Sequence, residues 1–109
     1  MLPKSDINCP MDSILKLLMG PWTAYIVWFL HLKGEMRFGD LKRALNGVSS
    51  KILTERLRML ESAGIIYRHY EPTVPPKVSY GLAERGQQLT PILQQLNNLG
   101  TQWVAEDEA

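Results

Sequence analysis

The chain of 109 residues has one cysteine, Cys9, and two histidines, and this scarcity excludes several kinds of site. A single cysteine cannot form a disulfide within the chain. The cysteine and the histidines are scattered without metal-ligand spacing, so the sequence predicts no metal site. It also has no nucleophile paired with a base in a recognisable arrangement and no glycine-rich phosphate loop. We therefore expect neither enzymatic activity nor a cofactor, and the residues single out no small-molecule effector.

Long apolar runs are missing as well. No stretch is long enough to span a bilayer, and the N-terminus lacks a basic start followed by an apolar segment. We therefore expect a cytoplasmic protein with no membrane partner. The length, with 45% hydrophobic residues, suits a single domain with one core, and a domain of this size is small enough to favour dimerisation.

The chain has little net charge, +1, but its charges are unevenly distributed. Residues 37–85 carry nine basic and five acidic side chains, a net charge of +4. Residues 1–36 are balanced with three of each sign, and residues 86–109 carry three acidic side chains and no basic one. A local excess of basic side chains is the electrostatic pattern expected of a surface that binds nucleic acid.

Residues 49–63, inside this basic part, have the features of a capped amphipathic helix. Ser49 is suited to the N-cap, and Gly64 provides the left-handed residue that often ends a helix. Leucines recur at helical spacing and predict a buried stripe: Leu53, Leu57 and Leu60. The opposite face has short or basic side chains: Lys51, Glu55, Arg58 and Ser62. Such a face suits a helix that reads a DNA groove, and an ordinary solvated surface helix is the alternative.

The neighbouring segments favour the first interpretation. Residues 39–45 predict a short helix, and Asn46-Gly47 predicts the turn into residues 49–63, so the two helices form a helix-turn-helix. After Gly64 the pattern alternates, which predicts strands at residues 65–71 and 77–82 around a proline-rich loop. A hairpin directly after a reading helix is a wing that could present Lys77 to DNA, and a plain surface hairpin is the alternative.

The remaining segments predict helices around one core. Cys9-Pro10 begins a helix that ends at Gly20-Pro21, residues 22–32 form an apolar central helix, and residues 84–104 form the last helix. Residues 1–8 are read as an arm and residues 105–109 as an acidic tail. The first and last helices would form a two-fold dimer interface, with closure of the chain's own core as the alternative use of the last helix. The residues expected at this interface are Ile14, Leu18, Trp28, Leu93, Leu96 and Trp103.

Cys9 lies at the predicted N-terminus of the first helix. Backbone N–H groups there stabilise a thiolate, so a cysteine in this position is often more reactive than average. The alternative is a small side chain that only packs.

Two stretches carry a family resemblance: FGDLKRALNGVSSKILTERLRMLESAGII at residues 38–66 and VPPKVSYGL at residues 74–82. They strongly resemble the HxlR-type winged-helix transcriptional regulators, within the wider MarR-like group. The likeness extends from Cys9-Pro10 to Trp103. It implies bacterial, dimeric DNA-binding regulators, in several branches of which the cysteine matching Cys9 senses oxidants or electrophiles such as quinones and aldehydes.

Carried over to this sequence, the resemblance implies roles for individual residues. Major-groove contacts fall to the start and outer face of the reading helix: Ser49, Ser50, Lys51, Thr54, Glu55 and Arg58. Arg37 and Lys42 would contact backbone phosphates, and Pro75, Pro76 and Lys77 would form the wing tip. The chain departs from the family pattern at Pro21, where a basic residue is common, and at Ala83, where threonine is usual and would cap the last helix.

The sequence as a whole predicts a mainly α protein with a small β-hairpin, a winged helix-turn-helix whose terminal helices form a dimer interface. We expect a homodimeric, sequence-specific DNA-binding transcriptional regulator, acting as a repressor, with Cys9 as its candidate redox or electrophile sensor. The alternative function is a winged-helix protein-interaction module that binds no DNA.

Overall fold

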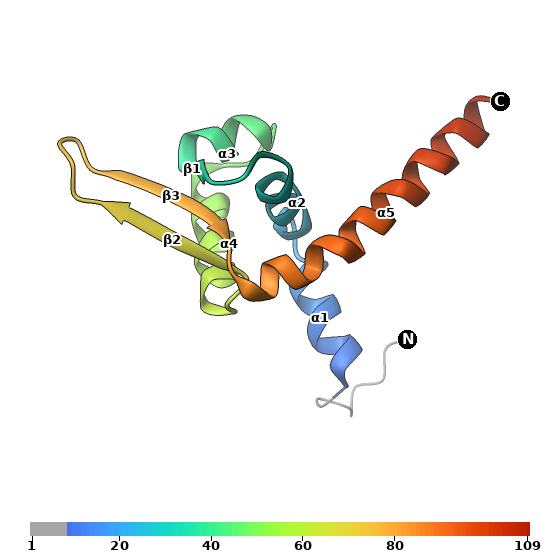
Figure 1. The fold of residues 1–109 in the computed structure, drawn as a ribbon, viewed down its shortest axis with the longest axis horizontal. Helices are drawn as coiled ribbons and strands as arrows, with labels where there is room; N and C mark the ends of the chain where they lie inside the picture. The colour runs from blue at the N-terminus through green and yellow to red at the C-terminus, as the bar shows by residue number, and fades with distance from the viewer. Residues whose placement is uncertain (1–8) are drawn as a thin grey trace.

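The computed structural model describes residues 9–109, so the predicted arm, residues 1–8, lies outside the described part. Within residues 9–109, five helices and three strands form a mainly α fold with a small antiparallel sheet (Figure 1). The elements are α1 (Pro10–Leu18), α2 (Thr23–Lys33), β1 (Met36–Arg37), α3 (Phe38–Ala44), α4 (Ser50–Ser62), β2 (Ile66–Glu71), β3 (Lys77–Leu82) and α5 (Glu84–Glu108). This is the winged helix-turn-helix class that the sequence predicts.

Helix α2 lies at the centre of the core. It buries Ile26, Val27 and Leu30 completely or almost so, as its apolar composition predicts. The buried hydroxyl of Thr23 is satisfied, because its single O–H has two carbonyl acceptors within reach, those of Leu18 (3.0 Å) and Gly20 (2.9 Å). One side of α2 nevertheless remains open, since two of its large side chains are exposed: Tyr25 and Leu32.

The helix-turn-helix consists of α3 and α4. The Ser49 hydroxyl caps α4 by accepting a hydrogen bond from the Ile52 N–H at 3.1 Å. Gly64 follows the helix with φ = 77°, the left-handed conformation that favours glycine. The predicted leucine stripe of α4 is buried: Leu53, Leu57 and Leu60. Burial of this stripe fixes which face of α4 is turned to solvent.

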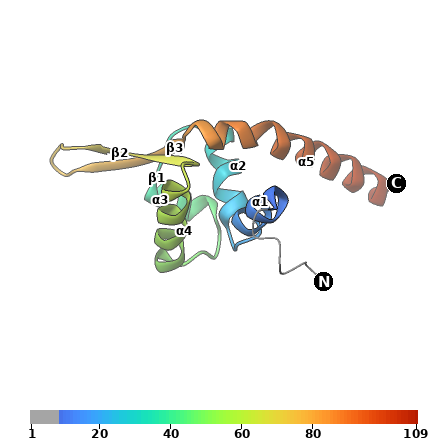
Figure 2. The same cartoon turned by 90° about the horizontal axis from the view of Figure 1, so that it is seen from below.

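The sheet has the strand order β1-β3-β2, and both strand pairs are antiparallel. Strands β2 and β3 form the wing, and β1 contributes only two residues, Met36 paired with Tyr80 and Arg37 paired with Ser79. Helices α3 and α4 lie on one side of the sheet (Figure 2). The sheet therefore has an inner face toward α4 and an outer face away from it.

Helix α5 is longer than predicted. The sequence predicts an end at residue 104 before an acidic tail, whereas the helix continues to Glu108. No glycine or proline interrupts residues 101–108, and the Gln102 amide donates to Glu106 at 2.9 Å, so nothing in this segment ends the helix. The acidic residues 106–108 are thus its last turn.

Proline inside α5 is accommodated by its neighbour. Pro91 has no N–H, so the Gln87 carbonyl four residues earlier loses its helical donor. The Thr90 hydroxyl donates to that same carbonyl at 2.8 Å and replaces the missing bond. The segment Thr90-Pro91 therefore interrupts the backbone bonding without ending the helix.

The wing and the second half of α5 project from the rest of the molecule in different directions (Figure 1). The radius of gyration, 15.8 Å, accordingly exceeds the value of about 13 Å expected of a compact chain of this length. Within residues 9–109 no single helix has the length and apolar character to cross a membrane. The pair α1 and α2 would meet those criteria only together, and the two are bent by 79°.

Candidate nucleic-acid interface

The outward face of α4 carries most of the residues predicted to read DNA. Their side chains are exposed: Ser49, Ser50, Lys51, Glu55 and Arg58. Thr54 is half-buried, and its hydroxyl donates to the Ser50 carbonyl at 2.8 Å. The hydroxyl of Ser49 is likewise engaged in capping the helix. The long side chains on this face that are available to a ligand are therefore those of Lys51, Glu55 and Arg58.

A hollow of about 370 Å³ lies between α4 and the inner face of the sheet. It is lined by Thr54, Leu57, Arg58, Glu61, Arg68 and Tyr80. Arg68 of β2 and Arg58 of α4 thus border the same hollow. Arg68 is not among the residues that the sequence predicts to contact DNA. Strand alternation was the available signal, because it puts Arg68 on the same face as the buried Ile66.

The wing tip is formed by the loop between β2 and β3. Pro75, Pro76 and Lys77 are all exposed there, as expected of a wing tip. The Thr73 hydroxyl donates to the Pro75 carbonyl at 2.8 Å within the loop. This tip lies far from the helices (Figure 1). Lys77 is therefore held well away from the basic side chains of α4.

Two further predicted contacts are Arg37, which immediately precedes α3, and Lys42 within α3, and both are exposed. Arg43 is paired with Asp40 at 2.6 Å, whereas Lys42 forms no ion pair within residues 9–109. Asp40 also accepts the Arg37 N–H at 3.1 Å. This backbone hydrogen bond and, after it, the Arg43 guanidinium hold the pKa of Asp40 below its ordinary value. Lys42 thus keeps a charge that α3 does not itself neutralise.

The residues predicted for a dimer interface fall into three groups. Ile14, Leu96 and Trp103 are 48%, 59% and 56% exposed. Leu18 and Trp28 are half-buried, and Trp28 packs against the core. Leu93 is only 8% exposed and belongs to the chain's own core, so it has little surface left for a partner. Leu93 thus packs in the chain's own core, as the alternative prediction for α5 has it, whereas Leu96 and Trp103 further along α5 do not.

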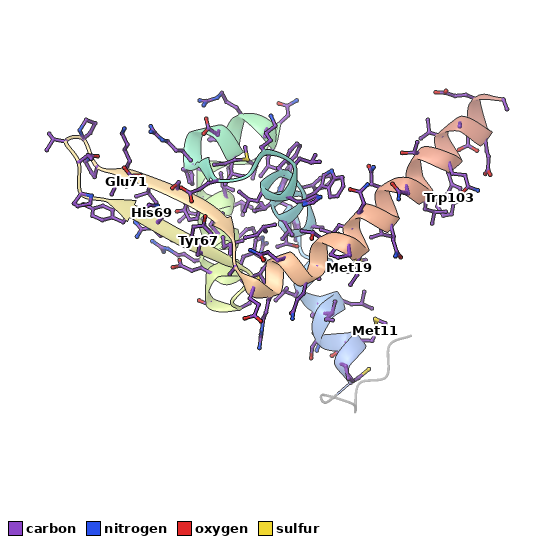
Figure 3. All side chains as sticks on the ribbon, in the orientation of Figure 1. Met11, Met19, Tyr67, His69, Glu71 and Trp103 are labelled. Carbon is purple, nitrogen blue, oxygen red and sulfur yellow. The ribbon has the colours of Figure 1, made fainter. Side chains whose placement is uncertain are left out.

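Helices α1 and α5 share an apolar surface that the described chain leaves uncovered. None of the nine residues of α1 is buried, although the helix is amphipathic. Figure 3 shows Met11 on α1 and Trp103 on the projecting half of α5. Between the two helices lies a mostly apolar hollow of about 400 Å³, lined by residues such as Ile14, Leu89 and Ile92. Extended apolar patches of this kind commonly mark interaction surfaces.

Cys9 is the N-cap of α1 and is half-buried. Its side chain makes no capping hydrogen bond, so the sulfur is not engaged by the helix that it precedes. Within residues 9–109 no three histidine, cysteine, aspartate or glutamate side chains are arranged to hold a metal ion. The position of Cys9 fits both a reactive thiol and a packing residue.

Comparisons with known proteins identify the family of this arrangement. The profile of the HxlR-like helix-turn-helix family matches residues 17–108. An uncharacterized HTH-type transcriptional regulator from Synechocystis is 40% identical over 99 residues, which are 91% of this chain and 73% of that protein.

Solved structures agree with this assignment. The structure of a MarR-family protein from Porphyromonas gingivalis superposes with a TM-score of 0.81 at 33% identity and covers 92% of this chain and 97% of its own. The oxidized form of HypR, described as a redox regulator, gives a TM-score of 0.79 at 34% identity and covers 86% and 96%. These proteins share the winged helix-turn-helix fold with the chain.

Proposed function

The chain belongs to the HxlR-like helix-turn-helix family, and from this premise we propose that it is a homodimeric repressor that recognises a specific double-stranded DNA site. The family and the named relatives are transcriptional regulators, not enzymes, and the chain is accordingly a transcriptional regulator with a helix-turn-helix DNA-binding fold.

The observation that carries the proposal is the solvent-facing basic side of α4. Helix α4 is fixed by its buried leucines, and it exposes Lys51 and Arg58 without an ion pair within residues 9–109. Long basic side chains on a rigid helix suit hydrogen bonding to base edges in a major groove. We propose that Lys51, Thr54, Glu55 and Arg58 read bases, with Ser49 and Ser50 close to the DNA at the helix start.

Phosphate contacts would supply most of the affinity. We propose that Arg37, Lys42 and Lys77 make them, with Pro75 and Pro76 shaping the wing tip near a minor groove. Arg68 joins this set because it borders the same hollow as Arg58. Placement of basic groups on α3, α4 and the wing would let one chain follow the backbone on both sides of the groove that α4 enters.

Two chains would bind through α1 and α5. A helix of nine residues without a buried side chain has little to stabilise it in isolation, so α1 needs a surface to cover its apolar side. Ile14, Leu96 and Trp103 would form the centre of this surface, and Leu18 and Trp28 would border it. A two-fold dimer would present two α4 helices to two half-sites of DNA.

The experiment that tests DNA recognition is a fluorescence-anisotropy titration of the reduced protein. One duplex carries the DNA upstream of the protein's own gene, a second carries the same bases in scrambled order, and both are titrated at two salt concentrations. We expect tighter binding to the upstream duplex and a steep loss of affinity with salt. Absence of binding to both duplexes at low salt would overturn the proposal in favour of a protein-interaction module.

We further propose that Cys9 responds to oxidants or electrophiles. Its place at the start of α1 supports this, because α1 belongs to the proposed dimer surface and a change at the thiol would act on the spacing of the two α4 helices. HypR, a structural neighbour, is described as a redox regulator. Diamide would oxidise two Cys9 thiols to one intermolecular disulfide and be reduced to its hydrazine. This role would be contradicted if diamide abolished DNA binding by the Cys9→Ser protein as it does for the wild type.

A further inference from the structure

A cluster of polar side chains lies on the outer face of the sheet, away from α4. Glu35, which precedes β1, accepts a hydrogen bond from the Tyr67 hydroxyl at 2.5 Å and another from the Ser79 hydroxyl at 2.6 Å. The Nδ1 atom of His69 lies 3.6 Å from the same carboxylate. The Glu35 carboxylate thus connects the segment before β1 to side chains of both wing strands.

The hydrogen bond from Tyr67 crosses a whole strand. In the order β1-β3-β2, Tyr67 lies on β2 and pairs with Gly81 on β3, so its ring must pass over β3 to reach Glu35. A Cβ atom added at Gly81 would overlap the Tyr67 ring. Gly81 is itself buried, although it lies on the outer face. The glycine therefore makes room for the ring, and the ring covers the glycine. Figure 3 shows Tyr67 and His69 along the wing.

The base of the wing is anchored in the core, where Ile66 is buried and Tyr80 and Leu82 pack, but the rest of the wing projects from the molecule (Figure 1). A hairpin of two strands is marginally stable by itself. Strand β1 pairs with β3 through only two residues, and β2, at the opposite edge of the sheet, does not pair with β1. The hydrogen bond from Tyr67 to Glu35, with His69 close to the same carboxylate, ties β2 to the segment before β1.

We propose that Glu35, Tyr67 and Gly81 form a latch that sets the orientation of the wing relative to α4, so that Tyr67 and Glu35 are positioning residues for DNA binding by Lys77. In this proposal the latch acts on DNA binding through the orientation of the wing. The effect of the latch on DNA affinity rests on the proposed function, whereas its effect on the orientation of the wing does not. Charge-assisted hydrogen bonds of the kind that Glu35 accepts are among the stronger ones in proteins, which suits this role.

The first test uses the free protein and needs no DNA. Tyr67→Phe removes the hydroxyl and keeps the ring, and Tyr70→Phe is the matched control on the same strand, since the Tyr70 hydroxyl makes no hydrogen bond with residues 9–109. Amide hydrogen exchange of residues 66–82 should become roughly two- to tenfold faster in Tyr67→Phe and stay unchanged in Tyr70→Phe. Gly81→Ala should accelerate exchange in the same segment by displacing the ring. Wild-type exchange rates in Tyr67→Phe would overturn the latch.

The second test measures the coupling between the latch and the wing tip. Lys77→Ala, Tyr67→Phe and the double variant are titrated with the upstream duplex. If the latch positions Lys77, the affinity lost through Lys77→Ala becomes smaller in the Tyr67→Phe background. Additive losses would overturn the positioning role even if the wild type bound DNA normally. A wild type that binds no DNA would overturn the proposed function and this positioning role, while the exchange experiment would still decide whether the latch exists.

Discussion

Among single residues, Ser49 shows how one hydroxyl stabilises the start of α4. Its oxygen accepts the Ile52 N–H, one of the backbone donors that a helix start leaves without a partner. Ser49→Ala should therefore lower the free energy of unfolding by about 1 kcal/mol. Ser50→Ala is the matched control, because Ser50 is exposed and makes no side-chain cap. Urea denaturation of both variants measures the difference, and equal losses would contradict the capping role.

Glu35 gives a prediction about pH at the same scale. Hydrogen bonds from Ser79 and then Tyr67 hold the pKa of Glu35 below its ordinary value of 4.5, and nearby His69 acts in the same direction. A lowered folded-state pKa means that the stabilisation is complete above pH 4.5 and is lost as the pH falls through the folded-state value.

The test compares the wild type with Glu35→Gln by urea denaturation from about pH 6 to about pH 3. The stability difference between the two proteins should shrink as the pH falls below 4.5. The Tyr67 hydroxyl supplies a second readout, since its donation to Glu35 raises its pKa, and that pKa should fall in Glu35→Gln. A stability difference that did not change with pH would exclude the carboxylate as its source.

At the level of elements, substitutions in α4 and in the wing should weaken DNA binding in different ways. Arg58→Ala should cost roughly 1–3 kcal/mol on the preferred DNA site if Arg58 contacts guanine, with little loss on scrambled DNA. Lys77→Ala should weaken binding to all sequences alike and lower the salt slope by about one, as expected of a phosphate contact. Anisotropy titrations at several salt concentrations separate the two. Equal losses on both duplexes for Arg58→Ala would remove it from base readout.

Most elements could be predicted from the sequence because their signals are local. Leu53, Leu57 and Leu60 marked the buried side of α4, and alternation between Gly64 and Ala83 marked the wing. The end of α5 was placed too early, because an acidic segment was read as a tail. Unfavourable charge at a helix end costs only some tenths of a kcal/mol, which is too little to end a helix that contains no breaker.

At the scale of the whole molecule, the uncovered apolar surface of α1 and α5 predicts dimerisation. Leu96→Glu places a charge in the centre of that surface and should shift the protein to monomers. Gln95→Glu is the matched control, because it adds the same charge at an exposed neighbouring position of α5. Sedimentation velocity at micromolar concentration measures both. A dimeric Leu96→Glu protein would exclude this surface as the interface, and a monomeric wild type would exclude the dimer itself.

The helices, the wing and the solvent-facing side of α4 follow from the sequence, because hydrophobic periodicity and capping residues act over a few positions of the chain. Which distant side chains meet depends on the folded structure. Arg68 and Arg58 come to border one hollow, and Glu35 accepts hydrogen bonds from residues 32 and 44 positions away. Such contacts depend on strand order and register, which long-range packing sets and no local pattern encodes. The same packing buried Leu93 and left Leu96 exposed on the same helix.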